Sequence, residues 1–410
     1  MEFDFFFCAT ASKSQDGLHP QSFARNISQF HSQKHCRQDS GERKKAREDA
    51  RGNGAERGTS NYKERSYMEM EKRFKMFVYK EGELPLVHNG PCKNIYTTEG
   101  RFIHEIQLGN RFLTSDPEKA HVFFLPFSVV MMVSYVYKPN TYDTTPLKRF
   151  VSDYISLVSN KYPFWNRSLG ADHFFLSCHD WAPETSKVNP YLFNKAIRVL
   201  CNANTSEGFN PAKDASLPEV NFRTGAANGM MGGNSALRRP LLAFFAGGNH
   251  GPIRPLLLKH WKNDNDSSSS SDIRVYEYLP KELAPYYNEM MKKSKYCLCP
   301  SGYEVASPRI VEAIYSECVP VIISDDYVLP FSDVLNWNAF SLFLPSTEIP
   351  NLRTILDSIP LTRYVEMQQR LKQVRTHFEL NQPPKPYDMF HMILHSIWLR
   401  RLNVHLTPHD

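Results

Sequence analysis

The chain has 410 residues, of which 41% are hydrophobic, so it is long enough for two or three domains with buried cores. Its 49 basic residues are balanced by 43 acidic ones, and the net charge of +6 does not indicate a nucleic-acid-binding protein. The eight cysteines include no CxxC pair and no zinc-type spacing, so we expect no structural metal. The longest apolar run begins at Val122 and spans about twelve residues, whereas a bilayer needs about twenty.

Residues 1–66 are rich in Ser, Arg, Glu and Gly and contain few apolar side chains, so we expect this segment to be disordered. From Phe74 onward the pattern is that of a folded domain. Residues 75–80 predict a strand, residues 99–108 a helix, and residues 146–165 an amphipathic helix.

The sequence GADHFFLSCHDWAPE, residues 170–184, predicts a strand that ends just before His179 and Asp180. In an open parallel sheet the carboxyl ends of the strands face the ligand, so these two residues are candidate general bases. His173 lies at the opposite end of the strand and is expected to be structural. The alternative for His179 and Asp180 is a packed histidine beside an aspartate that braces the loop.

The next segment, residues 191–201, has helical spacing and predicts an amphipathic helix that ends near Cys201. Cys201 could pair with Cys178. Residues 202–219 are rich in Pro and Asn, and we expect them to link two halves of the chain.

A polar, glycine-rich boundary at residues 226–239 precedes a second group of elements. The strand PLLAFFAG leads into the glycine loop 247–251 and a helix that carries Arg254 near its start. Backbone N–H groups and an arginine at the carboxyl end of a strand suit a pyrophosphate.

The same arrangement recurs in residues 294–326, which read as strand, loop, helix and strand. Ser307 is the expected N-cap of the helix and Pro308 its first residue, next to a loop that Gly302 makes pliable. Arg309 and Glu312 lie on one side of this helix, where they would hold phosphate and hydroxyl groups. The alternative is a solvated surface pair, which this spacing also predicts.

The run CPSGYEVASPRIVEAIYSECVPVIISDDYVLPF, residues 299–331, resembles the signature region of the exostosin family, glycosyltransferase family 47, in its plant branch. The run DPEKAHVFFLPFS, residues 116–128, is similar to that family as well. The resemblance covers roughly residues 70–400. It implies the GT-B fold, an α/β architecture of two Rossmann-like domains that face a central cleft. Alternating strands and helices in two halves, each with a glycine loop, favour the same class.

We therefore expect an N-terminal domain at residues 67–235, a nucleotide-sugar-binding domain at 236–345, and C-terminal helices at 346–410 that brace the two. After residue 326 the sequence predicts another turn, helix and strand.

The resemblance implies transfer of a sugar from a UDP-sugar to a cell-wall polysaccharide or another glycan, without a cofactor or metal. Arg254, Arg309 and Ser307 would hold the phosphates and Glu312 the ribose, beside the loop with Gly302 and Glu304. Asp180 or His179 would be the base of an inverting transfer. However, Glu304 and Glu312 have the E-x7-E spacing of some retaining enzymes, which leaves the stereochemistry open.

Two alternatives remain at this stage. The chain could be a non-catalytic glycan-binding or scaffold subunit of a polysaccharide synthase complex, or a nucleotide-sugar enzyme of the cytosol. By resemblance we expect a lumenal location at the Golgi membrane and possible glycosyltransferase partners, although no membrane anchor is visible in the sequence. No nucleic-acid partner is expected.

Overall fold

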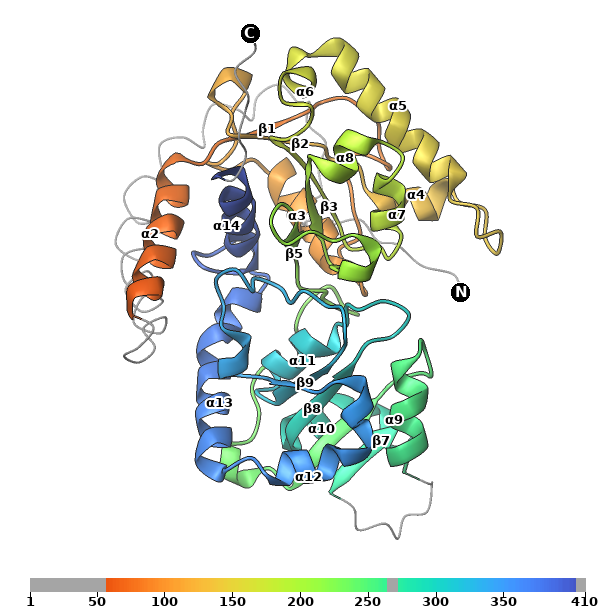
Figure 1. Cartoon of the computed structure of the whole chain (residues 1–410), viewed down its shortest axis with the longest axis vertical. Coiled ribbons are helices and arrows are strands. Elements are labelled where there is room, and N and C mark those ends of the chain that lie inside the picture. The colour runs from red at the N-terminus through yellow and green to blue at the C-terminus, as the bar shows by residue number, and fades with distance from the viewer. Residues whose placement is uncertain (1–56, 264–271, 403–410) are drawn as a thin grey trace, which may run out of the picture.

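The computed structural model describes residues 57–263 and 272–402. Within these ranges ten strands form two parallel five-stranded sheets, one in each half of the chain. Figure 1 shows the two halves stacked along the long axis of the molecule, each with helices around its sheet. The expected α/β architecture with two parallel, Rossmann-like sheets is therefore confirmed.

The first sheet has the spatial order β1-β2-β3-β4-β5, which is also the order along the chain. Its strands are β1 (Met76–Val78), β2 (Val122–Phe124), β3 (His173–Ser177), β4 (Ile197–Leu200) and β5 (Ala215–Ser216). The helices that connect them are α3 (Thr97–Gln107), α4 (Val129–Tyr135), α5 (Thr145–Lys161), α6 (Pro163–Ser168), α7 (Ala182–Ser186) and α8 (Pro190–Asn194).

The second sheet has the order β10-β9-β8-β6-β7, so the direction of strand addition reverses beside β6. Its strands are β6 (Leu241–Ala246), β7 (Ile273–Tyr276), β8 (Ser294–Pro300), β9 (Val319–Ile323) and β10 (Leu342–Phe343). Helices α9 (Ile253–Trp261), α10 (Tyr287–Lys293) and α11 (Arg309–Tyr315) connect them. In open α/β sheets, ligands bind outside the carboxyl ends of the strands at such a reversal. Here these ends belong to β6 and β8.

Both faces of each sheet are buried. In β3, Phe174 packs into one core and Phe175 into another; in β8, Cys297 and Leu298 alternate in the same way. One of the three cores contains residues of both halves, which joins the two sheets into one packed body. Buried parallel strands explain why both strands are apolar runs without alternation.

Three C-terminal helices run from the second half back to the first: α12 (Leu352–Asp357), α13 (Leu361–Val374) and α14 (Met389–Leu402). Helix α13 contributes Tyr364 and Met367 to the core under the second sheet. Helix α14 contacts β4 and β5 of the first sheet. The C-terminal segment thus packs against both halves.

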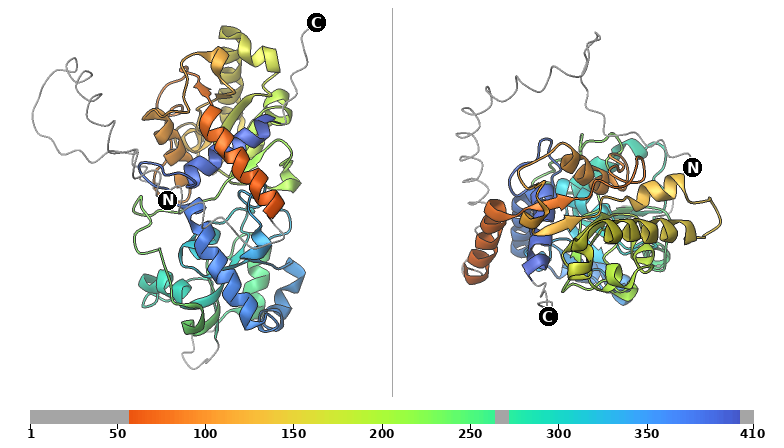
Figure 2. Two further views of the ribbon diagram at one scale, coloured as in Figure 1. Left: turned by 90° about the vertical axis from the view of Figure 1, so that its left-hand side faces the viewer. Right: turned by 90° about the horizontal axis from the view of Figure 1, so that it is seen from above.

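The segment expected to be disordered through residue 66 ends in a helix. Helix α2 (Arg57–Arg73) lies beside α14, as both views in Figure 2 show. Ser66 is buried and hydrogen-bonds to His395, and Tyr67 stacks on Tyr387 with 4.0 Å between ring centroids. Because residues 57–66 are mostly polar, the sequence did not indicate that Ser66 and Tyr67 are buried. The earlier residues of that segment lie outside the described ranges.

Three further expectations about elements were wrong. Residues 191–201 form the short helix α8 and then strand β4, because Val199 and Leu200 are buried on opposite faces of the sheet. Residues 202–219 are not simply a link, since they contain the edge strand β5. Between β9 and β10 the described chain has a 3-10 turn, η6 (Trp337–Ala339), in place of the expected helix.

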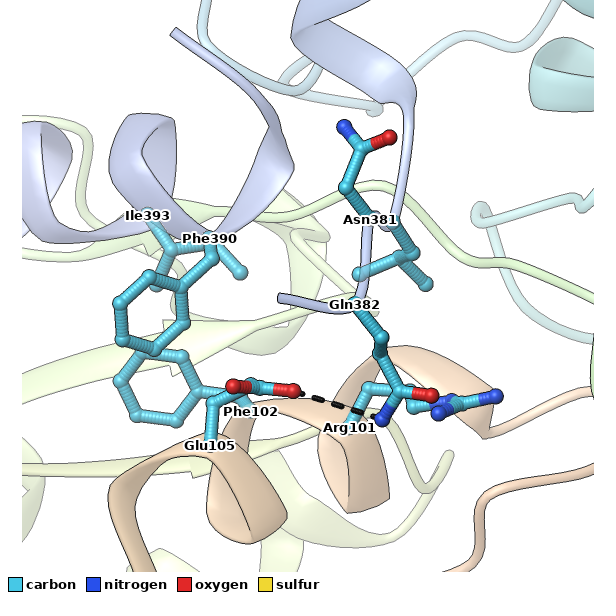
Figure 3. A pocket seen from close by; sticks show the side chains of 8 residues that line it. Arg101, Phe102, Glu105, Asn381, Gln382, Phe390 and Ile393 are labelled. Carbon is cyan, nitrogen blue, oxygen red and sulfur yellow. Dashed lines mark hydrogen bonds between the residues drawn. The ribbon is translucent and has the colours of Figure 1, made fainter. Parts of the chain in front are cut away.

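A small pocket lies between α3 and the segment that precedes α14 (Figure 3). Its cavity of about 10 Å³ has room for about one water molecule. Gln382 donates a hydrogen bond of 3.3 Å to Glu105 across it. The pocket is therefore a packing defect at a helix contact and too small for a sugar nucleotide.

Candidate active site

Two glycine-containing loops meet at the carboxyl ends of β6 and β8. Gly251, with φ of +67°, is so close to Gly302 that a Cβ on it would lie 1.8 Å from the Gly302 carbonyl oxygen. Any larger residue at position 251 would push the two loops apart. The glycines are thus required for direct contact between the loops that follow the two strands.

Arg309, the first residue of α11, reaches across to β6. Its Nε and Nη2 donate hydrogen bonds of 3.1 and 2.9 Å to the Ala246 carbonyl oxygen. A Cβ on Gly247 would lie 2.1 Å from Nη2, so only glycine leaves space for the guanidinium. The arginine is therefore fixed at the strand reversal and is not part of a free surface pair.

Arg254 lies beside Arg309 at the start of α9. It is 7% exposed, and its Nη1 donates to the Gly248 carbonyl oxygen at 3.2 Å, while its Nε is buried without a hydrogen-bond partner. Burial and the charge of Arg309 lower the pKa of Arg254 to about 10. Two neighbouring arginines, one of which has a lowered pKa and an unused donor, are chemically suited to an anion with more than one charge.

Ser307 does not cap α11 as the sequence suggested. Pro308 occupies the N-cap position and no side chain caps the helix. The Ser307 hydroxyl is instead buried without a partner. Buried polar groups normally form hydrogen bonds, so Ser307, in the loop after β8, and Arg254, at the start of α9, each supply an unused donor. Because α11 has only seven residues, these side chains matter more than the helix dipole.

Glu312 lies one turn further along α11, where Tyr287 of α10 donates a hydrogen bond of 2.8 Å to its Oε2. Burial and the charge of Glu312 hold the pKa of the Tyr287 hydroxyl well above its usual value, so this hydroxyl remains a donor. It leaves Oε1 of Glu312 available to accept from a ligand. Tyr287 was not identified from the sequence, because α10 carries no motif.

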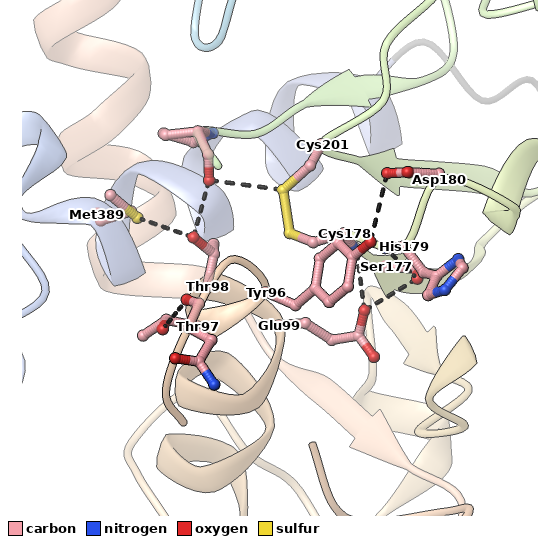
Figure 4. The surroundings of a disulfide bond; sticks show 12 residues. Tyr96, Thr97, Thr98, Glu99, Ser177, Cys178, His179, Asp180, Cys201 and Met389 are labelled. Carbon is pink, nitrogen blue, oxygen red and sulfur yellow. Dashed lines mark hydrogen bonds between the residues drawn. A yellow bond between two sulfur atoms is a disulfide. The ribbon is translucent and has the colours of Figure 1, made fainter. Parts of the chain in front are cut away.

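In the first half, His179 and Asp180 follow β3 as expected. Figure 4 shows both residues beside Tyr96 and the disulfide between Cys178 and Cys201. The disulfide, anticipated as a possible pairing, joins the segments that directly follow β3 and β4. A second disulfide, Cys297–Cys318, was not anticipated and ties β8 to the start of β9.

Asp180 and His179 differ in their protonation chemistry. Burial raises the pKa of Asp180 to about 6, partly offset by the Tyr96 hydroxyl, which donates to Oδ1 at 3.5 Å. Burial lowers the pKa of His179 to about 4, and its Nδ1 accepts a hydrogen bond of 3.0 Å from the Trp181 amide. Asp180 is thus the group whose ionisation is poised for proton transfer near neutral pH.

The end of β3 is fixed by a fully buried carboxylate. Glu99 of α3 accepts hydrogen bonds from the Ser177 hydroxyl at 2.9 Å and the Cys178 amide at 2.7 Å, and also from Ser128. His173, at the other end of β3, is fully buried between Asp172 and Tyr79, each at 2.8 Å. That position agrees with the structural role expected for it.

Strand register brings two further polar residues to the same edge. Ser177 pairs with Leu200, and Leu200 pairs with Ser216, so the three strands end side by side. Asp180, Asn202 and Glu219 follow these ends by two or three residues. Glu219 is 4% exposed and interacts electrostatically with Asp180 on its own half and with Arg254, Arg309 and Glu312 on the other.

The two halves meet directly at this edge. The Asn202 amide donates to Oε2 of Glu304 at 2.6 Å and to Oε2 of Glu207 at 3.2 Å. Burial, together with the charges of Glu207 and Asp180, raises the pKa of Glu304 to about 8. The pKa of Glu219 is raised well above its usual value, first by burial and then by Asp180. The site is rich in carboxyl groups that suppress one another's ionisation.

Comparison with known protein families identifies the chain. The model of the exostosin GT47 domain matches residues 70–359. The chain belongs to the exostosin family, glycosyltransferase family 47. Every residue of the two sheets and of the loops described above lies within the matched range.

Several plant proteins are similar to most of the chain. A probable glycosyltransferase of Arabidopsis thaliana is 61% identical over 340 residues, which are 83% of this chain and 64% of that relative. A probable glucuronosyltransferase of Oryza sativa subsp. japonica is 29% identical over 363 residues, 79% of this chain and 80% of the relative. A probable β-1,4-xylosyltransferase of Arabidopsis thaliana is 29% identical over 367 residues, 82% and 83% of the two chains. The chain thus spans less than two thirds of the first of these relatives.

Within this exostosin domain, the two glutamates of the E-x7-E spacing have different partners. Glu304 bonds to Asn202 of the first half, whereas Glu312 bonds to Tyr287 within the second. In the described ranges no group of three or more His, Cys, Asp or Glu side chains is arranged to hold a metal ion. None of the helices in the described part of this family member is long and apolar enough to cross a bilayer.

Proposed function

We propose that this exostosin-family chain transfers a sugar from a UDP-sugar to a hydroxyl group of a cell-wall polysaccharide or another glycan. The two sheets and their shared edge would then be the two domains of a GT-B enzyme. The observation that carries the proposal is the pair Arg254 and Arg309 at the strand reversal, with the unpartnered donors Arg254 Nε and Ser307 Oγ beside it. A pyrophosphate supplies the acceptors that these donors lack.

In this proposal the second half holds the donor. Arg254, Arg309 and Ser307 contact the pyrophosphate, and Glu312 accepts from the ribose hydroxyls while Tyr287 orients it. Gly302 lies against Arg254, where a Cβ would be 2.9 Å from Nη2, so this glycine allows the loop to approach the phosphates. Glu304 belongs to the same loop and faces the first half.

The first half supplies the base of an inverting transfer. The acceptor oxygen forms a bond to C1 of the sugar as the bond from C1 to the phosphate oxygen breaks. The acceptor proton moves to Asp180, and the negative charge that develops on UDP is stabilised by Arg254 and Arg309. Asp180 suits this role because its pKa of about 6 leaves it largely ionised at neutral pH. His179, with a pKa of about 4 and Nδ1 occupied, is the weaker candidate.

We propose that the enzyme works on the lumenal side of the Golgi membrane, without a cofactor or metal, alone or with glycosyltransferase partners. The disulfides Cys178–Cys201 and Cys297–Cys318 support an oxidising compartment.

The test is to incubate the full chain with a panel of UDP-sugars and plant glycan acceptors and to measure UDP release. We expect release that depends on both donor and acceptor and that falls by about a hundredfold or more in Asp180→Asn. Binding of UDP without release from any combination would instead support a non-catalytic subunit. Absence of UDP binding would refute the donor site itself.

A further inference from the structure

Aromatic side chains continue outward from the proposed base on the first half. Asp180 and Trp181 are adjacent in sequence, and both are half-buried. The centroid of the Trp181 ring lies 5.4 Å from that of His179 and 4.8 Å from that of Tyr137, which it meets edge to face. Tyr137, just after α4, is half-buried as well. The base is therefore followed by two aromatic side chains that contact each other and remain partly open to solvent.

The loop between α4 and α5, residues 136–144, extends this aromatic surface. The Tyr142 amide donates a hydrogen bond of 2.9 Å to the Tyr137 hydroxyl, and Tyr142 is 83% exposed. The Thr141 hydroxyl donates to the Lys138 carbonyl oxygen at 2.7 Å within the same loop. Figure 1 shows the loop projecting from the first half beyond α4 and α5. The loop thus presents a tyrosine to solvent on a backbone that is held by hydrogen bonds.

Tyr142 contributes little to the stability of the fold. Its exposed side chain buries little apolar area, and its φ of +53° is a conformation that costs free energy in any residue other than glycine. Such backbone strain is concentrated at functional sites, including those that hold ligands. The loop carries only one basic and one acidic residue, Lys138 and Asp143. It therefore offers a ligand an aromatic face rather than a net charge.

The proposed reaction leaves one substrate for this surface. The donor nucleotide is held by Arg254, Arg309 and Glu312 in the second half, whereas the acceptor must place a hydroxyl group at Asp180. Because Trp181 directly follows Asp180, sugar units next to the reacting one come within reach of its ring. The C–H face of a sugar ring packs on an aromatic face, and the polar tips of tyrosine and tryptophan can bond to its hydroxyl groups.

We propose that Trp181, Tyr137 and Tyr142 bind the acceptor as a chain of several sugar units, so that the enzyme acts on linear oligo- and polysaccharides in preference to disaccharides. This inference rests on the proposed function and specifies its acceptor. The contacts place the three residues in that order from Asp180, so Trp181 contacts units near the reacting one and Tyr142 contacts units further away. Aromatic side chains suit this task because they supply a large contact area with few rotatable bonds to immobilise.

The test uses acceptors that differ only in length. Disaccharides to octasaccharides of xylan, galactan, arabinan and mannan are supplied with a panel of UDP-sugars, and the rate of UDP release gives kcat and KM for each length. For the accepted series we expect KM to fall about tenfold or more from disaccharide to hexasaccharide while kcat changes little. In a separate measurement without donor, gels that contain the same polysaccharide should retard the chain. Added salt should change this retardation little, because the contacts are uncharged.

Variants locate the surface. Tyr142→Ala replaces an exposed side chain, so it should fold, raise KM for the hexasaccharide about three- to tenfold, and leave KM for the disaccharide and the affinity for UDP unchanged. Trp181→Ala should raise KM for shorter acceptors as well, and Trp181→Phe, which keeps an aromatic face, should recover most of that loss. Tyr62→Ala, at a 66% exposed position on α2, is the matched control and should behave as wild type. Figure 1 shows α2 on the opposite side of the molecule from the loop.

The outcomes separate the inference from the proposed function. A chain that transfers sugar with a KM independent of acceptor length overturns the inference alone, and so does an unchanged hexasaccharide KM in both Tyr142→Ala and Trp181→Ala. A chain that binds UDP but neither uses an oligosaccharide nor is retarded by a polysaccharide also overturns the inference. UDP binding without release, together with retardation that Tyr142→Ala weakens, would overturn the proposed catalysis and support the glycan-binding surface. A chain that does not bind UDP overturns the proposed function, and the inference with it.

Discussion

Asn202 and Glu304 are joined by a hydrogen bond of 2.6 Å, although they follow strands of different sheets. Asn202 comes directly after β4 and its disulfide cysteine, whereas Glu304 lies in the donor-side loop after β8. The bond therefore fixes the loop that carries Gly302 and Ser307 relative to Asp180. The charge of Glu207 helps to raise the pKa of Glu304, so the charge of the group that accepts this hydrogen bond depends on pH.

A first prediction concerns pH. The pKa of Glu304 is raised from 4.5 to about 8, chiefly by burial and then by Glu207 and Asp180. Between these values the folded chain keeps a proton that the unfolded chain has lost, so stability falls as the pH rises toward 8. We expect the Tm of Glu304→Gln to fall less than that of wild type between pH 6 and 8.5. An equal fall of Tm in the two proteins would contradict this. Glu289→Gln, which loses only a surface pair with Lys292, is the control and should show the same fall of Tm as wild type.

A second prediction separates two glycines. Gly247→Ala would place a methyl group 2.1 Å from Nη2 of Arg309, the mobile end of a long side chain, so the fold should survive while the guanidinium is displaced. We expect near-native Tm and UDP affinity lowered about tenfold, the value of one charge-assisted hydrogen bond.

Gly251→Ala is the contrasting variant, since its methyl group would lie 1.8 Å from a backbone oxygen at a φ of +67°. Here we expect a clear loss of Tm, because backbone must move. If Gly247→Ala binds UDP as wild type does, Arg309 has no part in donor binding at its observed position.

A third prediction concerns the base. If Asp180 accepts the acceptor proton, the rate of sugar transfer should rise with pH through about 6, because the carboxylate is the active form. Asp180→Asn should abolish this rise and lower transfer about a hundredfold or more, with UDP affinity nearly intact. Asp153→Asn, at an exposed position on α5, is the control. A wild-type pH profile in Asp180→Asn would place the base elsewhere.

A fourth prediction concerns α2. Tyr67 stacks on Tyr387, accepts a hydrogen bond of 2.8 Å from the Tyr387 amide and is 3% exposed. Tyr67→Ala should lower the free energy of unfolding by about 3 to 5 kcal/mol, the usual cost of truncating a buried aromatic side chain. Tyr62→Ala, on the same helix but 66% exposed, should have little effect. Equal Tm values for the two variants would mean that α2 does not stabilise the domain.

The parts of this structure that were predictable from sequence are those determined locally. The strand, loop and helix around Gly302 and Arg309 follow from spacing and glycine placement within a single βαβ unit. Asp180 could be placed because it lies three residues after the apolar strand β3, and the carboxyl ends of parallel strands share an edge. Local pattern did not predict the helix start correctly: serine is a favoured N-cap residue, but the N-cap of α11 is Pro308 and not Ser307.

The residues that were missed depend on contacts distant in sequence. Glu219 reaches the site only because β5, a strand of two residues, pairs with β4 in a register that no local pattern specifies. Strand β4 itself has spacing compatible with a helix, and burial on both faces decides its conformation. Tyr287 joins the site through its bond to Glu312, which lies 25 residues away in sequence.

Calorimetric titration with UDP shows whether Arg254, Arg309 and Glu312 hold the donor nucleotide. Arg309→Ala should weaken UDP binding roughly ten- to a hundredfold, about 1.5 to 3 kcal/mol for a charge-assisted contact. Glu312→Gln should weaken binding of UDP but not of inorganic pyrophosphate, because it acts on the ribose.

Arg353→Ala, which removes an exposed pair with Asp272, is the control and should bind UDP as wild type does. Circular dichroism must show that all the variants are folded. Unchanged UDP affinity in both Arg309→Ala and Glu312→Gln, or no binding of UDP to the wild-type chain, would contradict the assignment of the donor site.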